Sequence, residues 1–150
     1  MKIIYYCYGG SHSSVTAAGI HLGLLPLTRI PTPEELLAVP YYDSQAASEH
    51  GEYHFMGIDE KGNEVFIIGV KNMDSVFASI VADTLRVFGV SSEEYKLVNS
   101  LAKVNNRMRV GGFLSRRLGL VTLGRPLVIK GTQAAYWDFV SLVEQVKNRQ

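Results

Sequence analysis

Apolar residues along the chain fall into two kinds of pattern, short uninterrupted runs and longer stretches at helical spacing. Ile3–Tyr8 is β-branched and aromatic without polar alternation, which is typical of a strand buried on both faces of a sheet. Met73–Phe88 carries an apolar stripe at helical spacing and is followed by Gly89, which predicts an amphipathic helix and its end. Thr32 before Pro33-Glu34-Glu35 predicts the start of a shorter helix, because it combines a capping side chain, a proline and acids at the positive end of the dipole.

The same criteria divide the whole chain into alternating strands and helices. The expected strands cover residues 3–8, 53–58, 64–70, 95–98 and 126–130, and the expected helices cover residues 13–24, 33–39, 73–88, 104–118 and 132–148. The second and third strands predict a β-hairpin, since a glycine-containing turn joins them. Residues 95–98 fit a helix equally well, because Ser91-Ser92-Glu93-Glu94 also matches a helix start.

This order of elements predicts one α/β domain over residues 1–150. Parallel crossovers combined with one hairpin favour a three-layer sandwich, with a mixed, mostly parallel sheet of about five strands and one β-hairpin. In such sheets ligands bind beyond the carboxyl ends of the strands, so residues that follow strands are the first candidates for a site.

The segment Gly9-Gly10-Ser11-His12-Ser13-Ser14 lies between a strand and a helix that are both expected to be buried. Its glycines allow successive N–H groups to point into one concavity, the helix adds the positive end of its dipole, and three serine hydroxyls add donors. The pattern therefore predicts a P-loop-like turn that binds phosphate or another anion through Gly9, Gly10, Ser11, His12, Ser13 and Ser14. No Walker A lysine follows, and Ser13 stands where a Cys-x5-Arg phosphatase loop needs arginine. A turn with capping serines and no ligand explains the same residues.

Two side chains at this turn, those of His12 and Cys7, are of types that can take part in catalysis. His12 stands at the start of the predicted helix, where a neutral imidazole can orient a phosphate or act as an acid–base group. We therefore name His12 as the candidate catalytic residue, with a simple capping role as the alternative. Cys7 lies at the end of the preceding strand, where the positive end of the helix dipole would stabilise a thiolate. A lone cysteine at a strand end is more often a small buried residue.

The formal net charge of +1 hides an uneven distribution along the chain. Residues 1–94 carry 12 acids and 5 bases, residues 95–137 carry 8 bases and no acid, and residues 138–150 carry two of each. This asymmetry suggests that an anionic partner binds near the third quarter of the chain.

The basic segment supplies three more candidates for ligand binding, namely Asn105, Arg109 and Arg116. Arginine holds phosphate or carboxylate through two-point contacts that lysine does not make. The segment leaves the predicted strand 95–98 at the same edge as the glycine-serine turn, and Gly131-Thr132 is expected there too, after the predicted strand 126–130. A solvated basic helix that balances the acidic first half of the chain is the alternative.

Composition argues against several other classes. No apolar run approaches the roughly 18 residues of a membrane helix, no signal peptide is recognisable and one cysteine forms no disulfide framework, so we expect a cytoplasmic protein without a membrane partner. Nucleic acid is not an expected partner, because Phe113 alone is aromatic between residues 96 and 135. No metal site is expected, since Gly51 separates His50 from His54 in a strand-like segment. The sequence names no cofactor, and it leaves oligomerisation open.

Motifs spread along the chain resemble those of a known family. They are Lys2–Ser14 (KIIYYCYGGSHSS), Ile20-His21-Leu22-Gly23, Leu25-Pro26, Arg109–Arg116 (RVGGFLSR) and Gly124-Arg125-Pro126. Together they are similar to the domain-of-unknown-function family 3189 of Firmicutes, over essentially the whole chain. The resemblance implies a small bacterial cytoplasmic protein, and it implies no activity, cofactor or catalytic residue.

Two functional hypotheses follow. The first is an α/β domain that binds a phosphate or carboxylate at the glycine-serine turn, backed by Arg109 and Arg116. One form of this hypothesis is an enzyme that acts on a phosphorylated metabolite or nucleotide with His12 as its acid–base group, and the sequence leaves open whether the protein is an enzyme. The lack of a lysine in the loop argues against ordinary nucleotide triphosphate hydrolysis. The second is a non-catalytic regulatory or protein-interaction module that uses the basic segment 103–117.

Overall fold

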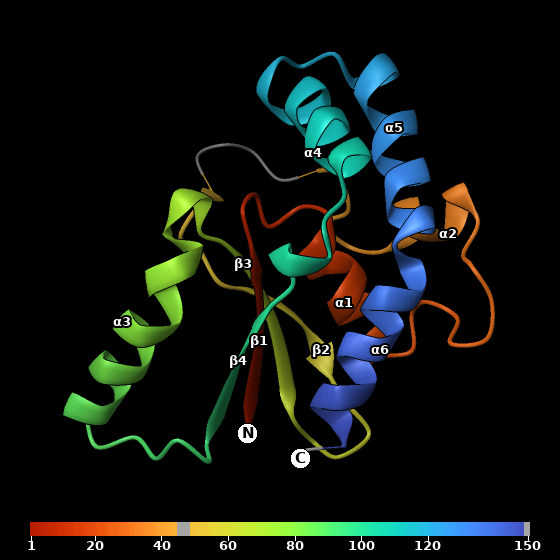
Figure 1. The fold of residues 1–150 in the computed structure, drawn as a ribbon. Helices are drawn as coiled ribbons and strands as arrows, with labels where there is room; N and C mark the ends of the chain where they lie inside the picture. The colour runs from red at the N-terminus through yellow and green to blue at the C-terminus, as the bar shows by residue number, and fades with distance from the viewer. Residues whose placement is uncertain (45–48, 149–150) are drawn as a thin grey trace.

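The computed structural model describes residues 1–44 and 49–148 as helices around a mixed sheet (Figure 1). Within these residues the sheet has four strands, β1 (Lys2–Cys7), β2 (His54–Ile58), β3 (Glu64–Gly69) and β4 (Tyr95–Asn99), in the order β2-β3-β1-β4. β1 is parallel to both β3 and β4, and β2 pairs antiparallel with β3 as the predicted hairpin. The α/β class and the mostly parallel sheet are therefore confirmed, with one strand fewer than expected.

Alternate side chains of β1 build two cores, one on each face of the sheet. Ile3 and Tyr5 are fully buried against α1 (Ser13–His21) and α6 (Tyr136–Lys147). Ile4 and Tyr6 face the opposite side and form a smaller cluster with α3 (Asp74–Val87). Figure 1 shows the result as three layers, with α1 and α6 on one side of the sheet and α3 on the other.

The helices around the sheet follow the sequence pattern to different degrees. All nine residues of α1 are buried, which explains why its sequence is apolar nearly all round. The short α2 (Pro33–Ala38) begins with the predicted cap, in which Thr32 and Glu35 form a reciprocal capping box. α3 forms where its stripe predicts a helix, but Phe77 is its only buried side chain, and Phe88 just after its end is 78% exposed. One helix thus covers this face of the sheet incompletely.

The predicted strand over residues 126–130 is wrong. These residues lie inside α5 (Val121–Ala134), which follows α4 (Asn106–Gly112) and a π-helical turn, η4 (Phe113–Arg117). A β-branched run after a proline favours a strand locally, and Pro126 removes one helical hydrogen bond. Packing overrides both preferences, because α4 and α5 approach closely enough that a Cβ on Gly111 would lie 2.6 Å from the backbone nitrogen of Val128.

This correction changes how the basic segment reaches the turn. Gly131-Thr132 belongs to α5 and is not the exit of a strand, so the expected convergence of three strand ends does not occur. Instead the α4–α5 hairpin, residues 106–134, extends over the carboxyl ends of the strands (Figure 1). In the described part of the chain, no helix combines the length and apolar character needed to cross a membrane.

Candidate functional site

The glycine-serine turn connects β1 to α1 and keeps its serines inside the protein. Gly10 adopts a φ of 71°, a left-handed conformation that glycine accepts without strain. The Sγ atom of Cys7 accepts a hydrogen bond from the backbone nitrogen of Gly10 at 3.1 Å and lies 3.2 Å from Ser14 Oγ. Ser13 Oγ lies 3.4 Å from Ser100 Oγ at the end of β4. The serine hydroxyls therefore stabilise the turn, and the side chain of His12 is the group that leaves it.

His12 meets a buried carboxylate that the sequence did not single out. Its Nε2 atom lies 3.0 Å from Oδ1 of Asp43, whose side chain is fully buried. Ser115 Oγ donates to the same carboxylate at 2.8 Å, and the Nε atoms of Arg116 and Arg125 lie 3.1 and 2.7 Å from its two oxygens. One carboxylate thus joins the turn to η4 and to α5 of the α4–α5 hairpin.

The backbone around Asp43 is held in an uncommon conformation. Asp43 has a φ of 48° and Tyr41 a φ of 67°, in the region that non-glycine residues seldom adopt. The backbone nitrogen of Asp43 donates to the carbonyl of Ser11 at 3.0 Å, which fixes the carboxylate beside the turn. Backbone strain of this kind clusters at functional sites, where surrounding contacts maintain it.

The carboxylate of Asp43 is ionised. Burial raises its pKa, but the hydrogen bonds from His12, Arg125 and Ser115 outweigh burial and hold the pKa well below the ordinary range of an aspartate. Because the charge persists, it attracts both arginines at neutral pH.

The site carries more positive charge than Asp43 neutralises. Two guanidinium groups and one imidazole share a single carboxylate, and among the described residues no second acid pairs with Arg116 or Arg125. Their side chains remain 27% and 40% exposed, and that of His12 is 14% exposed. Since each arginine uses Nε for Asp43, the terminal nitrogens of its fork are left for another anion.

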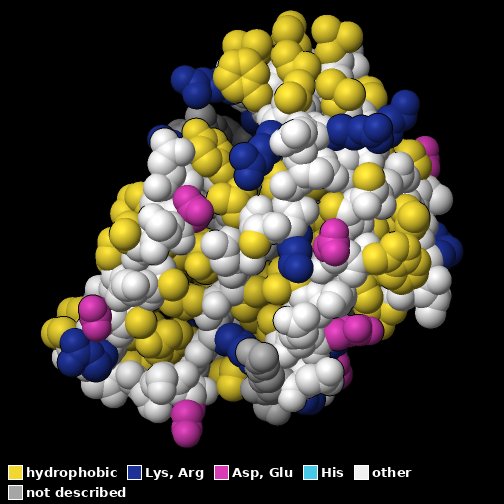
Figure 2. Space-filling model, viewed as in Figure 1, with side chains coloured by type: hydrophobic (Ala, Val, Ile, Leu, Met, Phe, Trp, Pro, Cys, Tyr) yellow, Lys and Arg dark blue, Asp and Glu magenta, His cyan; other side chains and the backbone are white. Residues whose placement is uncertain are grey.

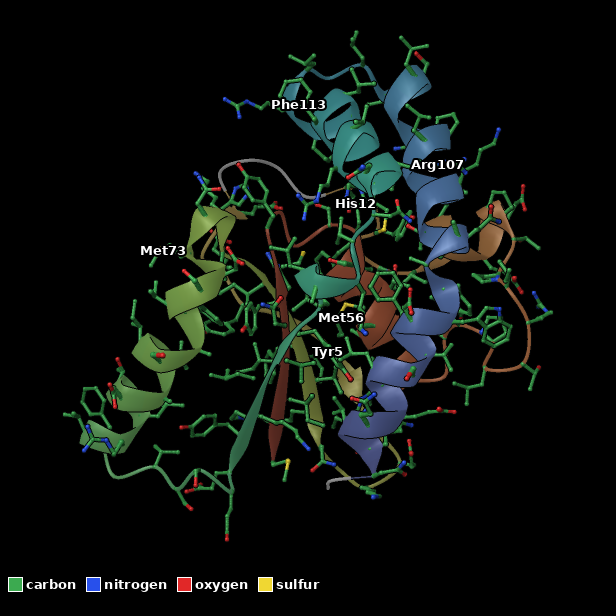
Figure 3. The ribbon with its side chains drawn as sticks, in the orientation of Figure 1. Tyr5, His12, Met56, Met73, Arg107 and Phe113 are labelled. Carbon is green, nitrogen blue, oxygen red and sulfur yellow. The ribbon has the colours of Figure 1, made fainter. Side chains whose placement is uncertain are left out.

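The π-helical turn explains how Ser115 and Arg116 both reach Asp43. Widening the helix over Phe113–Arg117 directs the Ser115 side chain inward, where the residue is 1% exposed, while the neighbouring Arg116 reaches the same carboxylate. Single π-helical turns within helices occur frequently at functional sites. Figure 3 shows His12 directly beneath α4, where a Cβ on Gly112 would lie 3.2 Å from the imidazole ring.

The two remaining predicted residues, Asn105 and Arg109, do not contact Asp43 in the described structure. Asn105 caps α4 by accepting a hydrogen bond from Met108 N and donating to the carbonyl of Gly131 at 2.7 Å. Arg109 is exposed on α4 and forms no ion pair with the described residues. Sequence reasoning missed Asp43 and Arg125. The signal for Arg125 was available, because it lies in the acid-free segment and within the motif Gly124-Arg125-Pro126.

A comparison with protein-family models gives one match. The model described as "Protein of unknown function (DUF3189)" matches residues 2–148 of the 150-residue chain. The chain belongs to this family. No curated protein and no solved structure matches the chain significantly. The family assignment confirms the resemblance seen in the sequence, and its description names no activity.

This DUF3189 protein contains a second histidine–aspartate pair, which is sealed from solvent. His21 Nε2 lies 3.0 Å from Asp59 Oδ2, and its Nδ1 lies 2.8 Å from the hydroxyl of Tyr5. An ionised carboxylate only accepts hydrogen bonds, so Nε2 carries the proton and Nδ1 accepts from the tyrosine. Both side chains of the pair are 0% exposed, which assigns it to the core of the DUF3189 fold and not to a ligand site.

We expect His21 to make stability depend on pH. Burial lowers the pKa of His21, and the hydrogen bond to Asp59 opposes this shift only in part. The unfolded chain therefore binds a proton more readily, so this stability is complete above the unfolded pKa of about 6.5 and is lost as pH falls below it, by up to about 1.4 kcal/mol per pH unit. Urea unfolding of wild type and His21→Gln between about pH 7.5 and 5.5 tests this, since the substitution removes the titration.

His50→Gln provides the control for replacing a histidine by glutamine outside the sealed core, because His50 is only half-buried. If His21→Gln does not fold, the imidazole resonances of wild-type His21 measure the same titration by NMR. A His21 that protonates at its ordinary pH in the folded protein would contradict the prediction.

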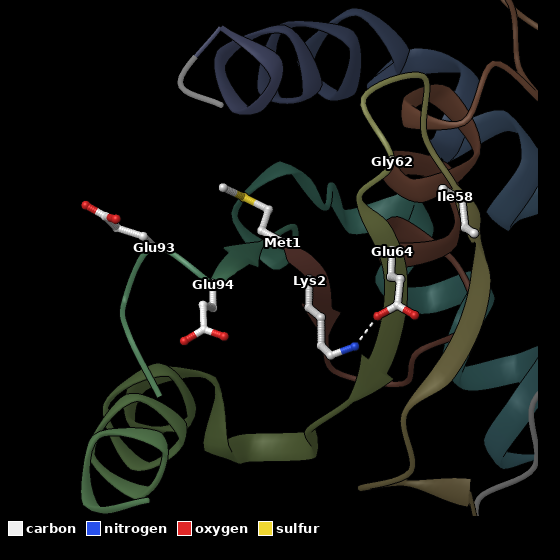
Figure 4. A pocket seen from close by; sticks show the side chains of 7 residues that line it. All are labelled: Met1, Lys2, Ile58, Gly62, Glu64, Glu93 and Glu94. Atoms are coloured by element: carbon white, nitrogen blue, oxygen red, sulfur yellow. Dashed lines mark hydrogen bonds and ion pairs between the residues drawn. The ribbon is translucent and has the colours of Figure 1, made fainter. Parts of the chain in front are cut away.

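A separate depression lies at the opposite edge of the sheet of the DUF3189 protein. It measures ≈ 550 Å³ and is lined by Met1, Lys2, Ile58, Gly62, Glu64, Glu93 and Glu94 (Figure 4). Lys2 is already paired with Glu64, and the remaining carboxylates repel an anion. The depression is therefore not a candidate for binding an anion. Among the described residues no cluster of three or more histidine, cysteine or acidic side chains is arranged to hold a metal.

Proposed function

We propose that this DUF3189 protein binds a small anionic ligand, a phosphorylated metabolite or a nucleotide, at the site formed by His12, Arg116 and Arg125. The observation that carries the proposal is the sharing of one buried carboxylate, Asp43, by two arginines and a histidine. Asp43 positions these three groups, and its single charge does not neutralise both guanidinium groups. A ligand that brings its own negative charge completes the arrangement.

The donors at the site favour phosphate over a single carboxylate. Two guanidinium forks and an imidazole offer more donors than one carboxylate accepts, whereas a phosphate group offers three terminal oxygens. Arg109 adds to this charge in the proposal, because it lies three residues before Gly112 on the same face of α4, and a Cβ on Gly112 would lie 3.2 Å from the His12 ring. The arginines would supply the positive charge that a lysine in the loop supplies in Walker A proteins.

His12 is the candidate for proton transfer if the ligand is turned over. Asp43 occupies Nε2 and orients the ring, and Nδ1 has no hydrogen-bond partner among the described residues. A histidine that is oriented by a carboxylate through one nitrogen and has no hydrogen-bond partner at the other is a frequent arrangement for acid–base catalysis. Nδ1 lies beside Gly112, where a Cβ would be 3.3 Å from it. In the catalytic form of the proposal, a water molecule attacks the phosphorus of a bound phosphate ester while Nδ1 takes a proton from that water. The P–O bond to the alcohol breaks, and the alcohol leaves with the proton that Nδ1 returns to it, so inorganic phosphate remains.

We expect phosphate or phosphorylated ligands to raise the melting temperature of the wild-type protein. A ligand at 100 times its Kd adds about 2.7 kcal/mol to the free energy of unfolding, which corresponds to a rise of roughly 5–10 °C for a chain of this size. Thermal-shift measurements with inorganic phosphate and a panel of nucleotides and sugar phosphates detect this. His12→Ala and Arg109→Gln should lose most of the ligand-induced rise, because both remove a donor while leaving the Asp43–arginine pairs in place.

Arg86→Gln is the matched control, since Arg86 pairs with Asp83 on exposed α3, away from the site. It should keep the full ligand-induced rise. Absence of a rise with every phosphate-bearing compound would overturn the proposal, and so would an equal rise in wild type and His12→Ala. For the catalytic form, release of inorganic phosphate from a bound ester must disappear in His12→Ala at saturating ligand.

A further inference from the structure

The free end of the α4–α5 hairpin exposes a group of large apolar side chains. These residues, which we call the hairpin cap, are Val110, Phe113, Leu118, Leu120 and Leu123, and they are 45–62% exposed. Figure 2 shows apolar side chains gathered over this end of the molecule, beyond the carboxyl edge of the sheet. Gly119, with a φ of 68°, turns the chain between the two helices. The cap therefore consists of residues from two separate helices and their connection.

Exposed bases lie behind the hairpin cap, toward the body of the protein. They include Arg107 and Lys130, and Arg117 is positioned over the Phe113 ring with its guanidinium carbon 5.6 Å from the ring centroid. In Figure 3 Phe113 lies near the free end of the hairpin and Arg107 lies nearer its base, and Figure 2 shows Lys and Arg side chains bordering the apolar cap. Residues 95–137 contain no acid, so nothing in the segment itself neutralises these bases.

An apolar tip followed by a collar of arginines matches the layers of an anionic membrane surface. Leucine and phenylalanine enter the boundary of the acyl chains, while arginines lie at the depth of the lipid phosphates. The anionic leaflet attracts the bases, and the apolar residues then add the energy of leaving water. The exposed end of α3 lacks this complementarity, because Arg86, the base next to Val87 and Phe88, is paired with Asp83, and the next charged residues along the chain are Glu93 and Glu94.

We propose that the hairpin cap docks onto the surface of an anionic phospholipid bilayer. The contact is peripheral and goes beyond the proposed ligand site, because it uses exposed residues at the free end of the hairpin. The sequence predicted no membrane partner because its apolar residues at 110, 113, 118, 120 and 123 are not contiguous, and only the hairpin gathers them.

Sedimentation with vesicles tests this docking on the full-length protein. We expect binding to vesicles of phosphatidylcholine with one-third phosphatidylserine, weak binding to phosphatidylcholine alone, and a loss of binding as salt rises. Leu118→Ser with Leu123→Ser should weaken binding by at least about tenfold, through lost apolar burial. Arg107→Gln with Arg117→Gln should weaken it about fivefold per residue, so roughly 25-fold together.

Two matched controls distinguish docking through the hairpin cap from non-specific adsorption of exposed apolar side chains. Val87→Ser with Phe88→Ser removes two side chains at the end of α3 that are 77% and 78% exposed, and it should leave vesicle binding unchanged. A Phe113→Trp variant in a Trp137→Phe background reports insertion directly, since Trp137 is the only tryptophan and its emission would otherwise dominate. Its emission should shift to shorter wavelength with anionic vesicles only.

Several results would overturn the proposal. They are an absence of binding to anionic vesicles, equal binding by Leu118→Ser with Leu123→Ser, and an unshifted Phe113→Trp emission. A concentration-dependent dimer in lipid-free buffer that the leucine substitutions abolish would assign the cap to a second copy of the chain. Capture of an acidic protein by the cap without any vesicle binding would assign it to a protein partner.

Discussion

Asp43→Ala is expected to lower the free energy of unfolding by about 3 kcal/mol or more, the range for removing one partner of a buried charge network. The substitution deletes the acceptor of Ser115 Oγ, Arg125 Nε and His12 Nε2, which lie 2.7–3.0 Å from the carboxylate. Ser115 is left buried without its partner, and two guanidinium groups are left without a counter-charge. Urea unfolding at neutral pH measures the loss.

Two further variants show whether the loss comes from the charge. Asp83→Ala removes a carboxylate that is 72% exposed and paired with Arg86, so it should change the free energy of unfolding by less than about 0.5 kcal/mol. Asp43→Asn keeps the shape and removes the charge. Because the pKa of Asp43 is lowered in the folded protein, its contribution is complete above the unfolded pKa of about 4 and is lost as pH falls below it. Asp43→Asn should therefore reduce the loss of unfolding free energy as pH falls below about 4. An unchanged pH dependence in this range would contradict the stabilising role of the Asp43 charge.

Gly124→Ala is expected to be at least as damaging, with a loss of about 3 kcal/mol or failure to fold. A Cβ at this position would lie 2.3 Å from the backbone nitrogen of Ser115 and 2.6 Å from the carbonyl oxygen of Gly111. Both neighbours are backbone atoms, so α4 and α5 must separate to admit the methyl group. Separation would also displace Ser115 and Arg125 from Asp43. Circular dichroism and urea unfolding measure the effect on the fold.

Gly112→Ala is the control, because it adds the same methyl group at the residue next to Gly111, where the group is directed toward His12 and not toward α5. There the Cβ meets only the His12 ring, at 3.2 Å, and alanine improves helix propensity by about 1 kcal/mol. We expect its stability to remain within about 1 kcal/mol of wild type. A Gly124→Ala protein as stable as Gly112→Ala would show that the close crossing of α4 and α5 does not hold the hairpin in place.

Local sequence patterns were sufficient to predict most helices and strands and the half of the site that the glycine-serine turn contributes. The run Ile3–Tyr8, the turn residues Gly9–Ser14 and the capping box of Thr32 and Glu35 each depend on residues close together in the chain. The hairpin of β2 and β3 and the buried positions of α6 followed for the same reason. These features specify the mostly parallel α/β fold and place His12 beyond the end of β1.

Only the tertiary structure decided that residues 126–130 are helical and which residues surround His12. The β-branched run at residues 126–130 favours a strand by local propensity. It is helical in the fold because Gly111 and Gly124 allow α4 and α5 to pack with their backbones in contact. Asp43 lacked a partner at any motif-like spacing, because its partners His12, Ser115 and Arg125 lie 31, 72 and 82 residues away in the chain. The sequence by itself therefore determined where positive charge and a glycine turn occur, whereas the fold determined that one buried carboxylate joins them. Charge pairing over such separations depends on distances in space, which local residue patterns do not encode.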